Sequence, residues 1–474
     1  MIQQKVKVGL LGVGLNTYWG QFDGLLPRLL TYQDAIAVQI EAMDVQVINT
    51  GMIDSPQKAD ECARQLKQAD VELVFLFIST YALSSTILPV AQQVGKPIII
   101  LNIQPVPAID YQTFNLMGDR GKMTGEWLAH CQACSVPEFA SVFNRAGVRY
   151  DIVTGYLSED YVWKEIASWA DAARVMYGMR TNRLGILGHY YCGMLDVYTD
   201  VMQQSATFGT HVELLEMCEL KAYRDEMTEQ ELKNKLKEFY DKFAVEASCE
   251  PEELIRAART SVALDKLVEV HQLGSLAYYY EGFRGNDYED IVTSVIAGNT
   301  LLTGYGIPVA GECEVKNAQA MKMMSLLKAG GSFSEFYAMD FEDDIILLGH
   351  DGPAHFAIAE EKVKLVPLPL YHGKPGKGLS IQMSVKPGDV TLLSVCEGKD
   401  GVFLLVAEGE AVSGKTLHIG NTNSRYRFEC GAREFMNLWS KAGPSHHCAI
   451  GIGHIAHILE KAAFLLNLQI KRIC

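Results

Sequence analysis

The sequence of 474 residues contains no apolar run close to the roughly 20 residues that a membrane-spanning helix needs. It also lacks a basic excess, because 42 Lys and Arg stand against 57 Asp and Glu, for a formal net charge of −15. Binding to nucleic acid depends on clustered Lys and Arg, and the acidic balance also disfavours an anionic membrane surface. We therefore expect neither nucleic acid nor a membrane as a partner.

A disulfide framework of the secreted kind is also not expected, because the 11 cysteines are scattered and odd in number. The first residues show no small-residue cleavage site and indicate a β-strand rather than a signal peptide. We therefore expect a cytoplasmic protein. Cys131 and Cys134 form a CxxC pair, but no second pair stands at metal spacing. Small buried apolar residues are the favoured interpretation, ahead of zinc or redox chemistry.

Internal repeats, low-complexity segments and long Pro/Ser linkers are absent, so the parts of the chain are expected to pack together. Hydrophobic residues make up 48% and charged residues 21%, which is typical of a globular protein with several cores. At ~150 residues per domain, the length suggests about three domains.

The first third alternates predicted strands with helices. Apolar stretches cover residues 6–13, 45–48, 71–78 and 97–101, and Ser55-Pro56 indicates the start of a helix between two of them. Residues 74–78 are apolar without a break, as in a parallel strand that is buried on both faces. This alternation predicts right-handed βαβ units and a doubly wound sheet.

The middle third repeats this pattern, with strands predicted over residues 183–187, 212–217 and 277–280. Thr228 and Glu231 form a capping box that opens one helix, and Pro251 opens another.

The last third is different: residues 362–412 are strand-rich, with turns at 386–389 and 399–401, before a final helix over 454–466. We predict two Rossmann-like α/β domains, residues 1–180 and 181–328. A mostly antiparallel, β-rich domain with the final helix follows over residues 329–474.

Polar and aromatic residues follow the predicted parallel strands, where open α/β sheets bind their ligands. These residues are Asn16, Tyr18, Trp19, Ser79, Thr80, Asn102 and Gln104. Rings and amides suit a neutral polyhydroxylated ligand such as a sugar, although ordinary polar capping of strand ends is an equally good interpretation. Gly9, Gly12 and Gly14 do not follow the G-x-G-x-x-G order of a dinucleotide site, so a tight turn is favoured there.

Carboxylates and imidazoles gather in four segments punctuated by Gly and Pro, at residues 311–316, 332–337, 349–355 and 443–447. Two oxygen and two nitrogen ligands would suit Mn²⁺ or a similar divalent ion better than a metal that prefers thiolates. The pattern alone does not choose among the 12 histidines and many glutamates. His454 and His457 are interpreted as the solvated polar face of the final helix.

These four segments, in this order, resemble the L-arabinose isomerase family, which is related in fold to the L-fucose isomerases. Gly311-Glu312-Cys313-Glu314-Val315-Lys316 stands at the family's G-E-G-D-W-K, and residues 332–337 stand at its S-F-M-E-D-Y. A G-x-H loop and a G-x-H-H segment follow. The resemblance extends over nearly the whole chain, through residues 15–20, 102–104, 118–120, 193–197, 280–281 and 304–306.

The resemblance implies two Rossmann-like domains followed by a β-barrel-like, mostly antiparallel C-terminal domain. It also implies that Glu312, Glu335, His350 and His447 bind Mn²⁺, or another divalent metal such as Co²⁺ or Mg²⁺. His355 is the alternative to His350, because the segment after Glu335 is slightly shorter than in the family. The sugar pocket would be lined by Asn16, Tyr18, Trp19, Gln104, Met194 and Tyr280.

The implied activity is aldose–ketose isomerisation of a free pentose or hexose through a cis-enediol, with Glu312 and Glu335 as acid and base in an undecided order. An L-fucose-type isomerase of other sugar specificity, or a sugar-binding or sensing protein without catalysis, are the alternatives. The family forms its active site between subunits of a tetramer or hexamer, so a homo-oligomer is expected. Asn16, Trp19, Asn102 and Tyr280 depart from the family's residues, so the sugar itself is left open.

Overall fold

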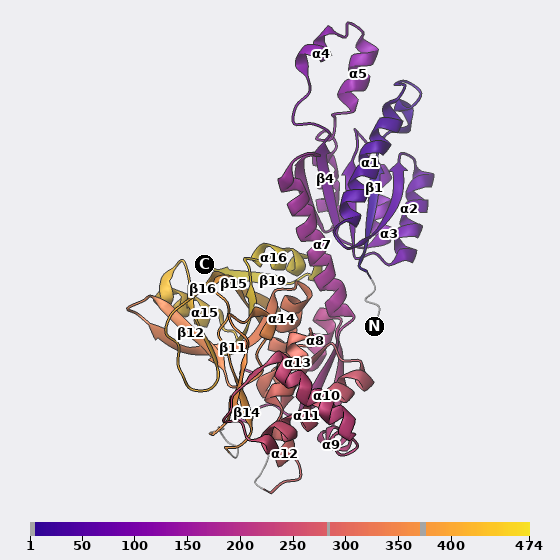
Figure 1. Cartoon of the computed structure of the whole chain (residues 1–474). Helices are drawn as coiled ribbons and strands as arrows, with labels where there is room; N and C mark the ends of the chain where they lie inside the picture. Colours follow the sequence, from indigo (N-terminus) through magenta and orange to yellow (C-terminus); the bar gives the residue numbers. More distant parts are fainter. Residues whose placement is uncertain (1–4, 282–284, 370–375) are drawn as a thin grey trace. The chain divides into compact units, whose positions relative to one another are not determined.

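The computed structural model describes residues 5–281, 285–369 and 376–474. The chain divides into two compact units, Met1–Tyr177 and Gly178–Cys474 (Figure 1). Residues 181–328 and 329–474, which the sequence assigns to separate domains, both lie in the second unit. Among the described residues, none of the helices combines the length and the apolar character that a membrane span requires.

The N-terminal unit is built on a parallel sheet with the strand order β2-β1-β3-β4-β5. The strands are β1 (Lys7–Val13), β2 (Gln46–Ile53), β3 (Leu73–Ile78), β4 (Ile98–Gln104) and β5 (Tyr150–Tyr156). The helices are α1 (Leu25–Glu41), α2 (Pro56–Ala69), α3 (Ser84–Val94), α4 (Tyr111–Leu116), α5 (Arg120–Leu128), α6 (Val136–Ala146) and α7 (Asp160–Arg180), with a 3₁₀ turn η1 (Asn16–Tyr18). Every residue of β3 is buried, as predicted for a central parallel strand.

Helices cover both faces of this sheet, which confirms the doubly wound prediction. The apolar sides of α2, α3 and α6 share one core cluster with the strands. The opposite face receives α1, which passes so close to β1 that Gln33 lies against Gly12. Gly9 and Gly12 therefore serve close packing inside the strand rather than a turn. Ser55 caps α2 as predicted, since its hydroxyl accepts a hydrogen bond from the Lys58 amide at 3.4 Å.

The cysteine prediction is wrong in two places. Cys131 and Cys134 are joined by a disulfide in the turn before α6, and Cys134 is exposed. A second disulfide joins Cys430 to Cys474. In both cases the fold brings the two Cα atoms to about 6 Å, which is within bridging distance and cannot be deduced from composition.

The second unit begins with a parallel sheet in the order β10-β9-β6-β7. The strands are β6 (Arg183–Gly188), β7 (His211–Leu215), β9 (Ser275–Tyr279) and β10 (Val309–Ala310). The helices are α8 (Val201–Phe208), α9 (Met217–Asp225), α10 (Glu229–Lys242), α11 (Pro251–His271), α12 (Glu289–Val292), α13 (Ile296–Gly304) and α14 (Val315–Leu326), with a 3₁₀ turn η2 (Gly311–Cys313). The capping box of Thr228 and Glu231 and the helix start at Pro251 are confirmed.

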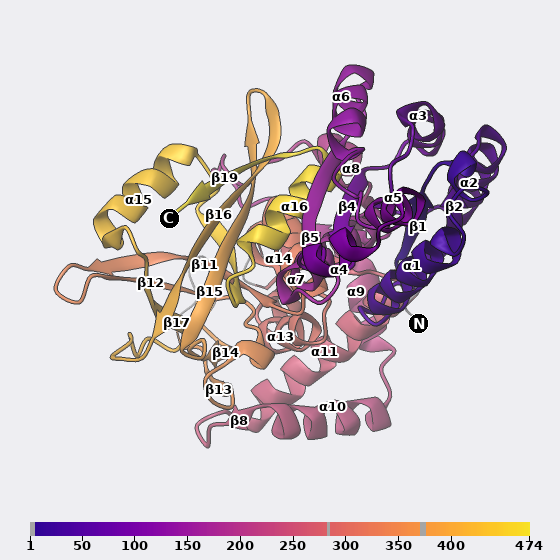
Figure 2. The same ribbon diagram turned by 90° about the horizontal axis from the view of Figure 1, so that it is seen from above.

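The rest of the second unit is a mostly antiparallel sheet in the order β15-β18-β11-β12-β17-β16-β19, as predicted, and β15 also pairs with β16 (Figure 2). Its strands are β11 (Gly330–Asp340), β12 (Ile345–His350), β15 (Gly388–Gly398), β16 (Gly401–Val412), β17 (Thr422–Arg427), β18 (His447–Ile452) and β19 (Gln469–Ile473). The expected barrel-like form needs correction. The sheet is not closed as a barrel, and its strand order ends in β19, which pairs in parallel with β16.

Smaller elements complete this part of the chain. They are β8 (Ala244–Val245), β13 (Lys364–Pro367), β14 (Leu379–Gln382), the 3₁₀ turn η3 (Phe356–Ile358), α15 (Gly431–Ala442) and α16 (Ala456–Leu466). The predicted final helix is thus confirmed as α16, but the chain continues into β19. His454 precedes this helix instead of lying on its face, whereas His457 lies on it and is exposed.

Helix α14 lies between the four-stranded parallel sheet and the seven-stranded, mostly antiparallel sheet of the second unit. It contacts β9 and β10 of the parallel sheet and β11, β15 and β18 of the antiparallel sheet. A helix that is covered on several sides must be buried almost all round, and nine of its residues are buried. The turn that leads into α14 is therefore fixed from both sides.

The strand register sets which side chains meet beside this turn. Glu335 of β11 stands opposite His447 of β18 on one side and Gly349 of β12 on the other. His350 is the next residue along β12. Antiparallel pairing therefore brings one glutamate and two histidines together from three distant parts of the sequence.

Gly349 allows the close pairing that holds His350. A Cβ at this position would overlap the carbonyl oxygen of Thr422 on β17. We predict that Gly349→Ala lowers the free energy of unfolding by about 1–3 kcal/mol, as overpacking does. The measurement is urea or thermal unfolding. Gly20→Ala is the matched control, since no heavy atom lies within 4 Å of a Cβ there. Equal stability of the two variants would contradict this account.

Candidate metal centre

Side chains from four separate segments converge in the second unit. Glu312 comes from the turn η2, Glu335 from β11, His350 from the end of β12 and His447 from the start of β18. Together with His446, which precedes His447, these residues form two overlapping groups of nitrogen and oxygen atoms that could hold a metal ion. In one group, Glu312, His350 and His447 place their ligand atoms within 4.8 Å of one another, and in the other Glu335, His446 and His447 do so.

The turn that presents Glu312 has an unusual backbone. Glu312 and Cys313 both adopt the left-handed conformation, with φ of 54° and 58°. Such residues cost roughly 1–3 kcal/mol each and persist only where the surrounding structure holds them. Cys313 is completely buried, and this burial raises the pKa of its thiol to about 12. Packing around Cys313 therefore holds the turn that directs Glu312 toward the histidines.

Two atoms in this cluster indicate that it fits a cation. Nε2 of His447 lies 3.5 Å from Oε2 of Glu312, and Nε2 of His350 lies 3.9 Å from Oε1 of the same carboxylate. Within the described part of the chain, Oε2 of Glu312 and Nε2 of His447 are buried and have no hydrogen-bond partner. A divalent ion would satisfy both atoms, and carboxylate with imidazole is a ligand set that suits Mn²⁺-like metals.

Burial also shifts the protonation of the neighbouring groups. Desolvation holds the pKa of His350 well below its usual value, with the nearby His447 and His446 acting in the same direction. His350 is therefore neutral at pH 7, which is the form that binds a metal. Desolvation raises the pKa of Glu335, against the opposing influence of His447. One carboxyl group beside the site is thus easier to protonate than usual.

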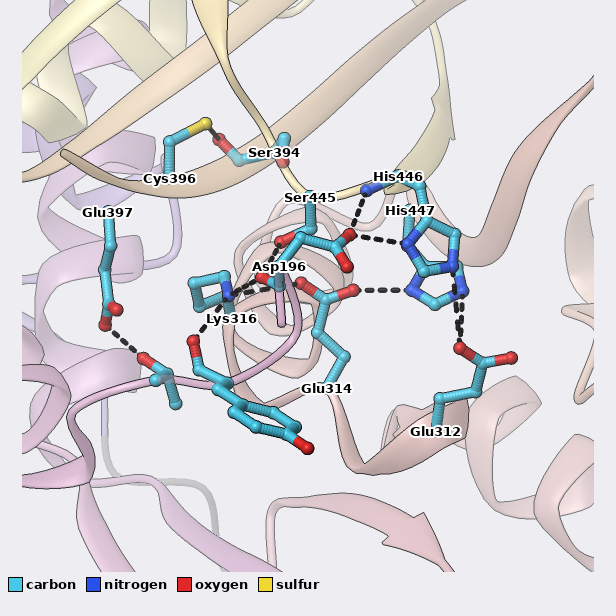
Figure 3. A network of polar contacts seen from close by, with 12 residues as sticks. Asp196, Glu312, Glu314, Lys316, Ser394, Cys396, Glu397, Ser445, His446 and His447 are labelled. Atoms are coloured by element: carbon cyan, nitrogen blue, oxygen red, sulfur yellow. Dashed lines mark hydrogen bonds and ion pairs between the residues drawn. The ribbon is translucent and has the colours of Figure 1, made fainter. Parts of the chain in front are cut away.

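A further layer of carboxylates contacts the two adjacent histidines (Figure 3). Glu314 lies 2.6 Å from Nδ1 of His447, and Asp196 lies 2.6 Å from Nδ1 of His446. Burial disfavours the charged form of His446, but the neighbouring carboxylates of Glu312 and Asp196 raise its pKa to about 9. Sequence reasoning missed Asp196, Glu314 and His446 as site residues. Glu314 and His446 lie close in sequence to predicted ligands, and this closeness is the one signal that could have indicated these two residues.

His355, the alternative to His350, is buried but belongs to neither ligand group in the described part of the chain. Desolvation lowers its pKa to about 4. It lies after the end of β12, directly before the 3₁₀ turn η3 (Phe356–Ile358).

A cavity of about 130 Å³ adjoins Glu312, Glu335 and His350. Its other lining residues include Tyr191, Tyr278, Tyr279, Asn299 and Asp351. Aromatic rings cover the C–H faces of sugars, while carboxylates and amides bind hydroxyl groups. The cavity therefore has the chemistry expected for a neutral polyol next to a metal.

The predicted sugar-contacting residues divide between the two units. Asn16, Tyr18, Trp19 and Gln104 belong to the N-terminal unit, where they follow or end β1 and β4. Trp19 donates a hydrogen bond from Nε1 to Asp54 at 2.7 Å, so its indole N–H already has a protein partner.

Met194 and Tyr280 belong to the same unit as the candidate metal ligands. Met194 lies in the segment after β6, close in sequence to Asp196, and Tyr280 directly follows β9. The ring of Tyr280 packs against Tyr288 and His189, with centroids 5.5 Å and 5.8 Å away. In the described structure the cavity is lined by Tyr278 and Tyr279 rather than by Tyr280.

Comparison with known proteins finds similarity to sugar isomerases. The family model of the L-arabinose isomerase C-terminal domain matches residues 330–469. L-arabinose isomerase from Phocaeicola vulgatus is 21% identical over 91% of this chain and 86% of its own, and the one from Nocardioides sp. is 25% identical over 68% and 67%. Sulfoquinovose isomerase from Priestia aryabhattai is 19% identical over 68% of this chain and 71% of its own. The domain match and these long alignments at low identity fit a divergent member of the L-arabinose isomerase family.

Proposed function

We propose that the protein is a metal-dependent aldose–ketose isomerase that acts on a free sugar. The observation that carries the proposal is a pair of overlapping groups of possible ligands, Glu312 with His350 and His447, and Glu335 with His446 and His447. Two buried atoms of the first group have no hydrogen-bond partner in the described structure, and a cavity with aromatic, polar and aliphatic lining adjoins them. Relatives of the chain are named as L-arabinose and sulfoquinovose isomerases, which supports this reaction class.

The reaction transfers one proton between C1 and C2 of the sugar and another between the adjacent oxygens. Glu312, Glu335, His350 and His447 would hold the cation, and Mn²⁺ is our first candidate on the chemistry of these ligands. When bound, this ion supplies a Lewis acid for the sugar oxygens.

Glu312 and Glu335 would act as the acid and the base. The raised pKa of Glu335 suits this role, because a carboxyl group that takes up a proton more readily than usual is a better general acid or base near neutral pH than an ordinary one. The proposal assigns the pair of roles to these two residues together.

For the substrate we propose a free pentose or hexose of the L-arabinose type. The alternatives are an L-fucose-type specificity and a binding protein without catalysis. A purely sugar-binding protein would have no need for carboxylates and imidazoles around Oε2 of Glu312 and Nε2 of His447. A panel of aldoses and ketoses assayed with Mn²⁺ distinguishes these alternatives, since a binding protein would convert none of them. A homo-oligomer and a cytoplasmic location stay predictions.

Removing either carboxylate should stop the reaction. We expect Glu312→Gln and Glu335→Gln each to lower kcat by about 100-fold or more, because an amide cannot exchange the proton. Initial rates of isomerisation at saturating sugar and Mn²⁺ measure the effect. Glu342→Gln, in an exposed turn after β11, is the matched control and should retain full activity. Full activity in both site variants would contradict the assignment.

Metal removal gives a test that does not depend on the sugar. Chelation should abolish activity and lower the thermal unfolding midpoint, and Mn²⁺ should restore both. Binding only to the folded state stabilises it by about 2.7 kcal/mol at 100 times the Kd. The unfolding midpoint of Glu312→Gln should respond much less to Mn²⁺. Activity that survives complete chelation would contradict the metal dependence.

A further inference from the structure

The two ring nitrogens of His447 face different carboxylates. The residue is completely buried, with 0% of its surface exposed. Nδ1 lies 2.6 Å from Oε2 of Glu314, which is a short, charge-assisted hydrogen bond. Nε2 points to Glu312 and has no hydrogen-bond partner in the described structure. Figure 3 shows the ring between these two carboxylates.

Glu314 is itself buried, with 1% of its surface exposed. A buried carboxylate is costly unless it is paired and hydrogen-bonded. Lys316 supplies part of this compensation, since its Nζ lies 3.8 Å from Oε1 of Glu314. The ammonium group is fixed in turn by the carbonyl oxygens of Asp196 at 2.6 Å and Tyr198 at 3.3 Å. The carboxylate that contacts His447 is therefore held in place from its far side.

We propose that Glu314 is a positioning residue of the metal centre, which keeps the proton of His447 on Nδ1 and directs the Nε2 lone pair toward the ion. The proposal rests on the proposed function, because it assumes that His447 binds a metal. A carboxylate that accepts Nδ1–H fixes the imidazole tautomer and ring orientation and makes Nε2 a better ligand. Glu314 would thus raise metal affinity without touching metal or sugar.

A nearby carboxylate provides a matched control. Glu397 accepts hydrogen bonds from Thr199 and, at 2.8 Å, from Gln204. It belongs to the same polar region (Figure 3) but has no contact with a histidine among the interactions of the described residues. Changing Glu397 to Gln removes a partly buried charge without altering the surroundings of His447.

Titration of the full-length, metal-free protein with Mn²⁺ by calorimetry tests the proposal. We expect Glu314→Gln to weaken the Kd by about 10- to 100-fold with unchanged stoichiometry. Glu397→Gln should bind like the wild type. At saturating Mn²⁺, Glu314→Gln should regain most of its kcat, since the sugar and the reacting carboxylates are untouched. A variant that merely misfolds would instead show reduced stoichiometry with an unchanged Kd.

An unchanged Kd for Glu314→Gln at full stoichiometry would overturn the positioning role. If that variant does not fold, ¹⁵N NMR of the metal-free wild type labelled at histidine decides instead. The His447 signal, assigned by its loss in His447→Gln, should show the proton on Nδ1, and a proton on Nε2 would overturn the proposal. If the wild-type protein binds no Mn²⁺, the proposed metal dependence itself is wrong. If the wild type and Glu314→Gln bind Mn²⁺ equally well, only the positioning role of Glu314 is wrong.

Discussion

The arrangement of the site depends on strand β11 pairing with β12 on one side and β18 on the other. Glu335 lies on this central strand, directly opposite His447 and beside the glycine that precedes His350. Because side chains alternate between the faces of a strand, a shift of one residue in the pairing with β18 would turn His447 away from Glu335. The register of this antiparallel pairing thus decides whether these two candidate ligands can meet.

Helix α14 provides the second constraint, since it fixes the turn that carries Glu312 and Glu314. Its position between the parallel and the antiparallel sheet explains why Lys316 and Glu314 are buried at its start. Their charges are tolerated there because each has a partner, and the partners are themselves hydrogen-bonded. The same packing holds Glu312 and Cys313 in a left-handed conformation that side chains rarely adopt. Strain and buried charge therefore meet next to the candidate ligands, which is typical of functional sites.

Local sequence signals predicted the elements well where short-range physics controls them. Four elements could be predicted because each depends on neighbouring residues in the chain. They are the apolar run of β3, the Ser55 cap, the Thr228 capping box and the Lys399-Asp400-Gly401 turn between β15 and β16. The disulfides could not be predicted, because cysteine spacing does not reveal which sulfur atoms meet in space. The edge strand β19 was also missed, since its pairing with β16 joins segments that are far apart in the chain.

For the site, the sequence by itself determined the residue types, and the resemblance of its ordered motifs to the L-arabinose isomerase family implied four metal-ligand candidates: Glu312, Glu335, His350 and His447. Only the tertiary structure decided that Glu312 and His350, in one group, and Glu335, in another, place their ligand atoms close to His447. It also decided that His350 rather than His355 lies in such a group, and that Glu314 contacts the far side of His447. The physical reason is that coordination and hydrogen bonding depend on distances between side chains from different strands. Those distances follow from register and packing, which act over the whole unit, whereas a motif records only its own neighbours in the chain.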